Sequence, residues 1–113
     1  SWVASYWGGR PTEDWMFSQV YSENAIATGW SETNFVHPKF EELLVQARAE
    51  LDDAKRREMY VEMQRIVHDN CSVIIPIFSA YGHASTSNVK RAANVASNWE
   101  FDGHKNTERW WMG

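Results

Sequence analysis

A continuous apolar run, Val73-Ile-Ile-Pro-Ile-Phe78, constrains the fold of this chain more than any other feature. Polar residues flank the run on both sides, a pattern typical of a strand buried on both faces. Pro76 cannot donate a hydrogen bond to a sheet ladder, so it fits best where a strand leaves one sheet and crosses to another. The sequence therefore predicts a buried crossing strand over residues 73–78.

Two stretches before this run have the spacing of helix faces. Apolar residues at i, i+3, i+4, i+7 and i+11 fall on one helical face: Phe40, Leu43, Leu44, Ala47 and Leu51. Pro38 fits the first turn of this helix. Asp52 or Asp53 caps a second helix, in which Tyr60 and Met63 begin an apolar stripe. The short link between the two helices predicts an antiparallel hairpin.

The N-terminal part combines a strand, a turn and a further helix. The segment from Trp2 to Trp7 is rich in β-formers and stops at Gly8-Gly9, which predicts a strand that ends in a tight turn. Acidic residues then begin an aromatic helix that runs from about Asp14 to Tyr21. The irregular polar stretch from Ser22 to His37 predicts a long surface loop.

Beyond the apolar run the pattern is weaker. Tyr81 to Ser87 has the composition of a further strand or extended segment, and Asn88 to Asn98 that of a loop. Trp99 to Trp111 predicts a short helical turn that docks through its tryptophans. Seven tryptophans in the chain either fill a core or line a cleft for a flat or extended ligand.

Charge and composition exclude several classes of partner. The formal charge is −4, and the basic residues Lys55-Arg56-Arg57 alternate with acidic neighbours, so we expect no nucleic-acid partner. Cys71 is the single cysteine, which excludes an internal disulfide. No apolar run approaches the roughly 20 residues of a membrane-spanning helix. Because the chain opens with Ser1 and Trp2 to Trp7 has the pattern of a buried element, we expect a fragment of a longer protein.

Metal-ligating and catalytic patterns are weak. Glu100, Asp102 and His104 alternate, but the neighbouring Gly103 and polar tail favour an exposed face. His68 and Cys71 lie three apart, whereas a structural zinc needs four ligands and no second pair has matching spacing. No Gly-x-Ser-x-Gly elbow and no dinucleotide-binding glycine motif is present. We therefore expect a protein that is not an enzyme, with no metal and no cofactor.

One segment combines the features of a ligand site. Trp7-Gly8-Gly9-Arg10 follows a predicted strand and precedes a predicted helix, the position where α/β proteins bind ligands. Glycines allow a ligand to approach the backbone, and a tryptophan supplies an apolar wall. The alternative is an ordinary turn, in which the tryptophan belongs to the core and Arg10 pairs with Glu13 or Asp14.

Four motifs occur in order along the chain: Tyr6-Trp-Gly-Gly-Arg-Pro-Thr-Glu-Asp14, Pro38-Lys-Phe-Glu-Glu-Leu-Leu44, Ala47-Arg-Ala-Glu-Leu-Asp52 with Lys55-Arg56, and Val73-Ile-Ile-Pro-Ile-Phe78. Together they resemble the C-terminal third of the family 5 extracellular solute-binding proteins, which include the periplasmic dipeptide- and oligopeptide-binding proteins. The resemblance implies a mixed α/β fold, an incomplete C-terminal part of a two-lobed periplasmic-binding-protein (type II) fold. Residues 1–72 would form part of the C-terminal lobe, and residues 73–113 a hinge strand and a tail that returns toward the N-terminal lobe.

The same resemblance implies a solute-binding subunit that delivers its ligand to an inner-membrane ABC permease. The location would be the periplasm or another extracytoplasmic compartment, with a membrane anchor of the full-length protein left open. Trp7, Gly8, Gly9 and Arg10 would line the cleft, and we also expect ligand contacts from Phe78 and Tyr81. Peptide binders of the family commonly carry Asp where Arg10 stands, so modified peptides and oligosaccharides join peptides as candidate solutes.

Other functions compete with this reading. A carbohydrate-binding or protein-interaction module would use exposed tryptophans in a free-standing domain. A hydrolase fragment lacks support, because no nucleophile and base occur in a recognisable pattern. If the chain does lack strand partners, its exposed sheet edges predict self-association.

Overall fold

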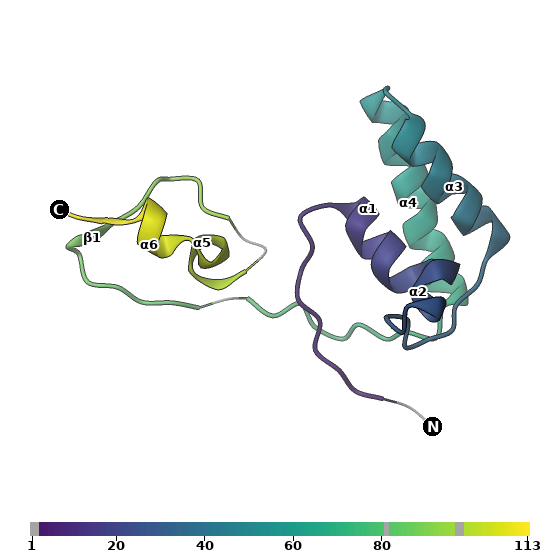
Figure 1. Cartoon of the computed structure of the whole chain (residues 1–113), viewed down its shortest axis with the longest axis horizontal. Helices are drawn as coiled ribbons and strands as arrows, with labels where there is room; N and C mark the ends of the chain where they lie inside the picture. The colour runs from purple at the N-terminus through teal and green to yellow at the C-terminus, as the bar shows by residue number, and fades with distance from the viewer. Residues whose placement is uncertain (1–2, 81, 97–98) are drawn as a thin grey trace. The chain divides into compact units, whose positions relative to one another are not determined.

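The computed structural model of this 113-residue chain describes residues 3–80, 82–96 and 99–113. The chain divides into two compact units. The helical unit comprises residues 3–4 and Arg10–Ile75, and the C-terminal unit comprises Ser5–Gly9 and Pro76–Gly113. Figure 1 labels the helices of both units, and each unit is described by itself below.

The helical unit begins with an aromatic helix that changes its winding. α1 (Glu13–Met16) continues directly into the π-helical turn η1 (Phe17–Tyr21), and α2 (Glu23–Ala27) follows after Ser22. Thr12 and Ser22 act as N-caps, since each side-chain oxygen accepts a hydrogen bond from the backbone N–H three residues later. The predicted aromatic helix is confirmed, whereas the predicted loop from Ser22 to His37 contains α2.

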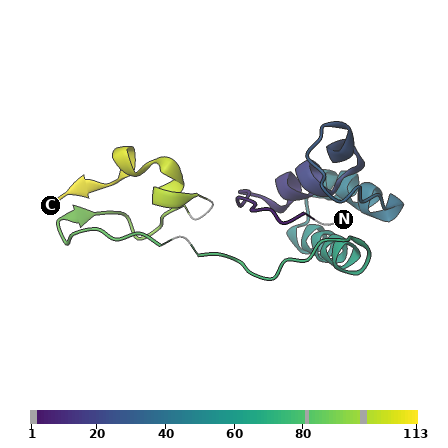
Figure 2. The same cartoon turned by 90° about the horizontal axis from the view of Figure 1, so that it is seen from below.

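The helical hairpin is confirmed. α3 (Pro38–Ala49) has Pro38 in its first turn, and α4 (Asp53–Asn70) has Asp52 as N-cap, whose carboxylate accepts from the backbone N–H of Ala54 and Lys55. The two helices pack side by side, as Figures 1 and 2 show from two directions. Three residues, 50–52, join them, which forces the chain to turn back on itself.

Aromatic rings fill the core of the helical unit. The Phe17 ring meets the Phe40 ring edge to face at 5.4 Å between centroids, and Phe35 meets Phe40 in the same way at 5.5 Å. Phe40 and Met63 are fully buried, so both helices of the hairpin reach this core. The predicted helix face is confirmed at Phe40 but wrong at Leu51, which is 92% exposed because α3 already ends at Ala49.

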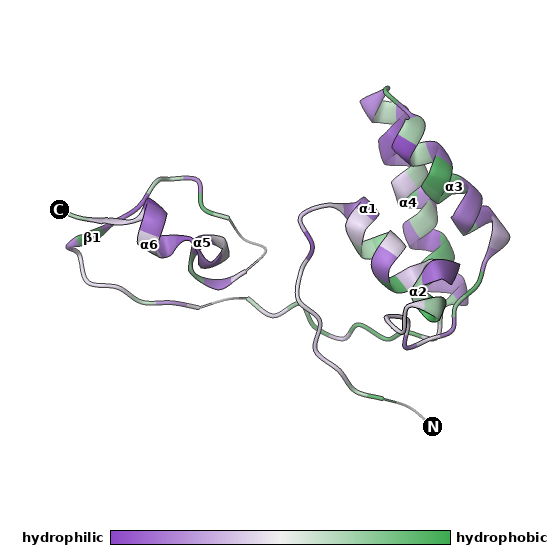
Figure 3. Ribbon diagram, viewed as in Figure 1, coloured by the Kyte–Doolittle hydropathy of each residue, from purple (hydrophilic) through white to green (hydrophobic). Residues whose placement is uncertain are grey.

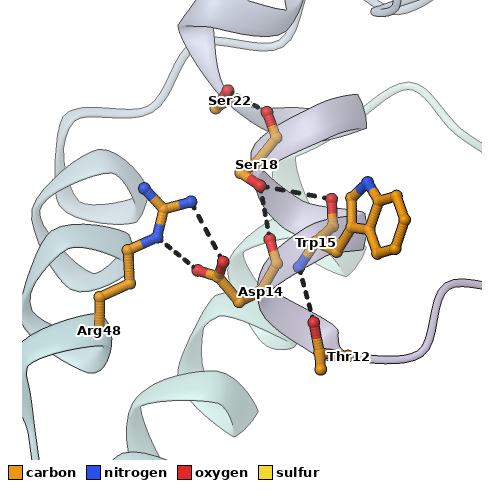
Figure 4. A network of polar contacts seen from close by, with 6 residues as sticks. All are labelled: Thr12, Asp14, Trp15, Ser18, Ser22 and Arg48. Atoms are coloured by element: carbon orange, nitrogen blue, oxygen red, sulfur yellow. Dashed lines mark hydrogen bonds and ion pairs between the residues drawn. The ribbon is translucent and has the colours of Figure 1, made fainter.

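An ion pair on the surface links α1 to α3. The Arg48 guanidinium donates from Nε to Asp14 Oδ1 at 2.7 Å and from Nη2 to Asp14 Oδ2 at 3.2 Å (Figure 4). The hydroxyls of Ser18 and Ser22 each donate to a backbone carbonyl four residues earlier, on the same helical stretch. About half of the Arg48 side chain is exposed, so water screens this pair.

The C-terminal unit contains short elements. β1 (Val89–Lys90) pairs antiparallel with β2 (Trp111–Met112), with Val89 opposite Met112. Between the strands lie α5 (Glu100–His104) and α6 (Asn106–Arg109). Residues 101–104 have φ of +50° to +66° and form a left-handed turn. Residues other than glycine rarely adopt this conformation. The predicted helical region from Trp99 is thus helical in part, and the predicted loop from Asn88 contains β1.

The predicted strands do not form in the described residues. Residues 3–7 and 73–78 are free of helix and strand, and residues 82–86 belong to no element either. The predicted burial of the run from Val73 is wrong as well: Ile74 is 88% exposed and Phe78 is 91% exposed. Figure 3 shows this extended segment, which follows α4, as predominantly hydrophobic. A strand buried on both faces needs neighbouring strands, and the described residues supply none to this segment. The two-lobed α/β architecture stays a prediction.

Candidate functional site

The predicted ligand segment from Trp7 to Gly9 is extended and lies in the C-terminal unit. Trp7 is half-buried, and its indole Nε1 donates to Ser5 Oγ at 3.1 Å. A Cβ added to Gly8 would lie only 3.0 Å from Cη2 of Trp99. The Trp99 ring therefore packs against the backbone of Gly8, and a side chain at this position would displace the ring. Gly9 is exposed.

Arg10 belongs to the helical unit and is half-buried. Its Nε donates to Oε1 of Gln19 at 2.6 Å, which ties the segment before α1 to η1. Asp14, one of the two acidic partners considered for Arg10, accepts two hydrogen bonds from the Arg48 guanidinium. The pairing of Arg10 with Glu13 or Asp14 stays a prediction.

The other two predicted ligand residues are Phe78 and Tyr81, and the structure describes only the first of them. Phe78 is in the C-terminal unit and is 91% exposed, so its ring is open to solvent along the extended segment. Tyr81 lies outside the described residues, as do Ser1, Trp2, Ser97 and Asn98. The predicted site stays a prediction, because its residues belong to both units.

A buried carboxylate organises the C-terminal unit. Asp102 is 4% exposed, and its Oδ1 accepts hydrogen bonds from the backbone N–H of Ala96 at 2.6 Å and from Arg109 Nη1 at 2.8 Å. The indole of Trp110 donates to Oδ2 at 3.3 Å. Arg109 also donates to the carbonyl of Asn94 at 3.1 Å. Asp102 therefore joins the loop after β1 to α5, to α6 and to Trp110, the residue between α6 and β2. Its charge is paired, as burial requires.

Three rings and a guanidinium lie next to this carboxylate, and we call them the ring cluster: His83, Arg91, Phe101 and Trp110. The His83 ring centroid is 5.4 Å from that of Trp110 and 5.9 Å from that of Phe101. The Arg91 guanidinium lies over the Trp110 ring at 5.7 Å, a cation–π distance. Arg91 Nη1 and His83 Nε2 are 2.7 Å apart. Three separate segments thus meet at the Trp110 ring.

The metal patterns noted in the sequence do not assemble. His104 pairs with Glu100 at 3.7 Å, while Asp102 is engaged by Arg109. His68 contacts the neighbouring Asp69 carboxylate. Across residues 3–80, 82–96 and 99–113, no group of three His, Cys, Asp or Glu side chains could hold a metal ion.

Two tyrosines of the helical unit have perturbed acidity. Burial raises the pKa of Tyr21, and the nearby Cys71 raises it further. Burial also raises the pKa of Tyr60, with a further contribution from the negative charge of Asp14. In both cases the phenolate would be placed in surroundings that favour the neutral phenol. Both phenols therefore ionise less readily than a tyrosine in water.

Sequence reasoning considered Asp102 only as a weak metal ligand and missed its partners. The signals were present: an Asp-Gly pair, an arginine seven residues later and an adjacent tryptophan. They could not be connected, because the contact depends on a left-handed turn over residues 101–104 that helical or strand periodicity does not describe. The participation of His83 and Arg91 had no sequence signal, since both lie in irregular segments.

Comparison with protein-family models, with characterised proteins and with solved structures finds no match to this chain. Within the described part of the chain, no helix has the length and apolar character needed to cross a membrane.

Proposed function

We propose that this chain is part of a solute-binding subunit of an ABC importer, related to the family 5 binding proteins, which captures peptides or related small solutes outside the cytoplasm. The observation that carries the proposal is the order of four motifs along the chain, from Tyr6 to Phe78. The local structure at three of them supports it. Thr12 caps α1, Pro38 opens α3 and Asp52 caps α4, so each of these motifs contains the start of a helix.

The exposed apolar segment after α4 gives further support. Residues 73–78 have the composition of an internal strand, yet Ile74, Ile77 and Phe78 are largely exposed in this chain. Exposing consecutive apolar side chains is costly, at about 25 cal/mol per Å² of apolar surface. The proposal explains them as a strand whose neighbours belong to the remainder of a two-lobed protein.

The test uses the full-length protein and its cognate permease. Isothermal titration calorimetry with peptides, modified peptides and oligosaccharides is expected to give one class that binds. The same class is expected to stimulate ATP hydrolysis by the reconstituted transporter only when the binding protein is present. Ligand binding without any effect on a transporter would contradict the proposal and favour a free-standing module.

Arg10 is the residue most informative about the ligand. Charge-assisted hydrogen bonds contribute about 1.5–3 kcal/mol, so Arg10→Ala in the full-length protein is expected to weaken binding by about 10- to 150-fold if the solute carries an anionic or acceptor-rich group there. Arg57→Ala, on the exposed surface of α4, is the matched control. Unchanged affinity on Arg10→Ala would show that Arg10 does not contact the ligand.

The second candidate function is a carbohydrate-binding or protein-interaction module. Exposed tryptophans favour it, since Trp15 and Trp30 in the helical unit and Trp111 in the C-terminal unit are each about half exposed. Exposed indoles are common in surfaces that bind sugars or proteins. If residues 1–113 alone bind an oligosaccharide as tightly as the full-length protein does, the site is local and the module is the correct function.

A further inference from the structure

Asp102-Gly103 is the one Asp-Gly pair of the sequence, and no Asn-Gly pair occurs in it. An Asp-Gly bond isomerises in water more readily than other aspartyl bonds, because glycine has no side chain to hinder the approach of its backbone nitrogen. The Gly103 nitrogen attacks Cγ of Asp102, and a C–N bond forms. A carboxyl oxygen leaves as water, which takes up the proton of the attacking N–H, and the product is a cyclic imide.

Hydrolysis of the imide completes the isomerisation. Water adds either to Cγ, which restores aspartate, or to the backbone carbonyl carbon, which gives isoaspartate. In isoaspartate the main chain passes through Cβ and Cγ, and the carboxylate is attached directly to Cα. The water released in the first step is regained in the second, so the reaction needs no oxidant, reductant or further reactant.

The folded C-terminal unit engages both reacting groups in other contacts. The Gly103 backbone N–H donates to the carbonyl of Trp99 at 3.4 Å. Both oxygens of the Asp102 carboxylate accept hydrogen bonds, Oδ1 from Arg109 at 2.8 Å and Oδ2 from Trp110 at 3.3 Å. The Asp102 side chain is only 1% exposed, so water has little access to it. Ring closure requires the nitrogen and the carboxyl group to leave these partners.

We propose that Asp102-Gly103 is a modification site, protected while the C-terminal unit is folded and reactive when this unit unfolds. Isomerisation then proceeds in proportion to the time that the unit spends unfolded. It also removes the acceptor at the centre of the unit, because a carboxylate attached directly to Cα has a shorter reach. Arg109 and Trp110 lose their common partner, and unpaired donors oppose burial. Unfolding of the C-terminal unit thus becomes irreversible.

The left-handed turn gives a second reason why an isomerised chain does not refold. Phe101, Asp102 and His104 have positive φ, a conformation that persists only where the surroundings fix it. The hydrogen bonds of Asp102 join this turn to the loop after β1 and to α6. Losing them removes contacts that offset the cost of the turn.

The first test compares the whole chain with and without urea at one pH and one temperature. Isoaspartate at position 102 is measured by mass spectrometry of proteolytic peptides, in which the two isomers differ in retention time and in their electron-transfer fragments. Isoaspartate is expected to accumulate slowly in the native chain and faster in urea. Equal rates would show that the fold gives no protection, and the proposal would be wrong.

Arg109→Ala tests the protection without denaturant. The change removes a donor to Oδ1 of Asp102 and the partner of its charge, so the unit unfolds more often. Isoaspartate is expected to form about 5- to 30-fold faster than in the unchanged chain. Arg57→Ala, on the exposed surface of α4, is the matched control and is expected to keep the original rate. No acceleration in Arg109→Ala would contradict the proposed protection.

The loss of refolding has its own readout in the Trp110 indole N–H. This group donates to Oδ2 of Asp102 in the native unit, so its NMR signal reports on the centre of the unit. After incubation in urea and dilution, the native Trp110 signal is expected to return only in proportion to the chains that retain aspartate. The signals of α3 and α4 are expected to return in full. Full recovery of the Trp110 signal in isomerised chains would overturn the proposed irreversibility.

Discussion

The helical unit and the C-terminal unit stabilise their centres by opposite means. In the helical unit the central side chains are rings and aliphatic groups, with Phe40 and Met63 fully buried. In the C-terminal unit the buried centre is a carboxylate, Asp102, surrounded by donors from its own unit. One centre depends on the hydrophobic effect, which has no direction, and the other depends on hydrogen bonds, which do.

The difference explains how each unit tolerates change. Apolar packing distributes the stabilising free energy over many contacts. Removing one large ring leaves a cavity, and the loss in free energy of unfolding increases with the volume of that cavity. A hydrogen-bonded centre concentrates its free energy in a few atoms, and removing the acceptor leaves several donors unpaired at once. We therefore expect different substitutions to unfold each unit, and the following experiments test the comparison from the largest effect to the smallest.

The largest effect is expected for Phe40→Ala. Phe40 is fully buried and meets the rings of Phe17 and Phe35, so its removal leaves a cavity at the junction of η1 and α3. A buried Phe→Ala change costs about 3–5 kcal/mol. Urea denaturation followed by circular dichroism is expected to show that loss in the helical signal. Phe78→Ala is the control, and a comparable loss there would contradict the exposure of Phe78.

The next largest effect is expected for Asp102→Ala in the C-terminal unit. The change leaves Ala96 N–H, Arg109 and the Trp110 indole without their common acceptor. Leaving a buried donor unpaired costs about 1–3 kcal/mol. NMR is expected to show loss of dispersion for residues 99–112 with the α3 and α4 signals retained. Glu108→Ala, an exposed acidic residue of α6, is the control and should leave both sets of signals in place.

Sequence could predict the helical unit far better than the C-terminal unit, for the same physical reason. The spacing from Phe40 to Ala47 and the cap at Asp52 predicted α3 and α4, because periodic burial leaves a periodic sequence. The short helix α2 was missed, since its Ser22 cap precedes only five helical residues. In the C-terminal unit, the centre depends on Asp102 in a left-handed turn, and such a contact leaves no period in the sequence.

The candidate ligand site was predictable only as a segment. A tryptophan followed by two glycines indicated close backbone approach, and the structure has Trp99 packed against Gly8 in that position. The packing partner lies 91 positions later in the chain (99 − 8), which no local pattern reveals. The run from Val73 to Phe78 was predicted as a strand from its composition, but it forms none. Strand-forming residues need a neighbouring strand to pair with, and composition does not show whether one is present.

A smaller effect is expected in the helical unit at alkaline pH. Because the folded-state pKa values of Tyr21 and Tyr60 are raised above the ordinary value of 10.0, their contribution to stability is fully present below that pH. It is lost as pH rises through the raised pKa values, since the unfolded chain then releases protons more readily. The midpoint temperature of thermal unfolding, measured from the helical circular dichroism signal, is expected to fall above about pH 10.

Tyr21→Phe and Tyr6→Phe make this alkaline test specific. Phenylalanine cannot ionise, so Tyr21→Phe is expected to reduce the alkaline loss of stability in the helical unit. Tyr6 is 69% exposed in the C-terminal unit and serves as the control. An equal reduction in both variants would show that general charge repulsion, and not burial of Tyr21, causes the alkaline effect.

The smallest effect is expected for the most visible polar contact of the helical unit, the Arg48–Asp14 pair in Figure 4. Its two hydrogen bonds are well formed, but the side chains are 49% and 33% exposed, so water screens their attraction. A double-mutant cycle with Arg48→Ala and Asp14→Ala is expected to give a coupling free energy of about 0–1 kcal/mol, falling with added salt. The Asp102–Arg109 pair has a carboxylate that is only 1% exposed, and it is expected to give a larger and less salt-sensitive coupling. If instead the Arg48–Asp14 coupling were the larger of the two, the helical unit would depend on its surface charges and the contrast between the two units would fail.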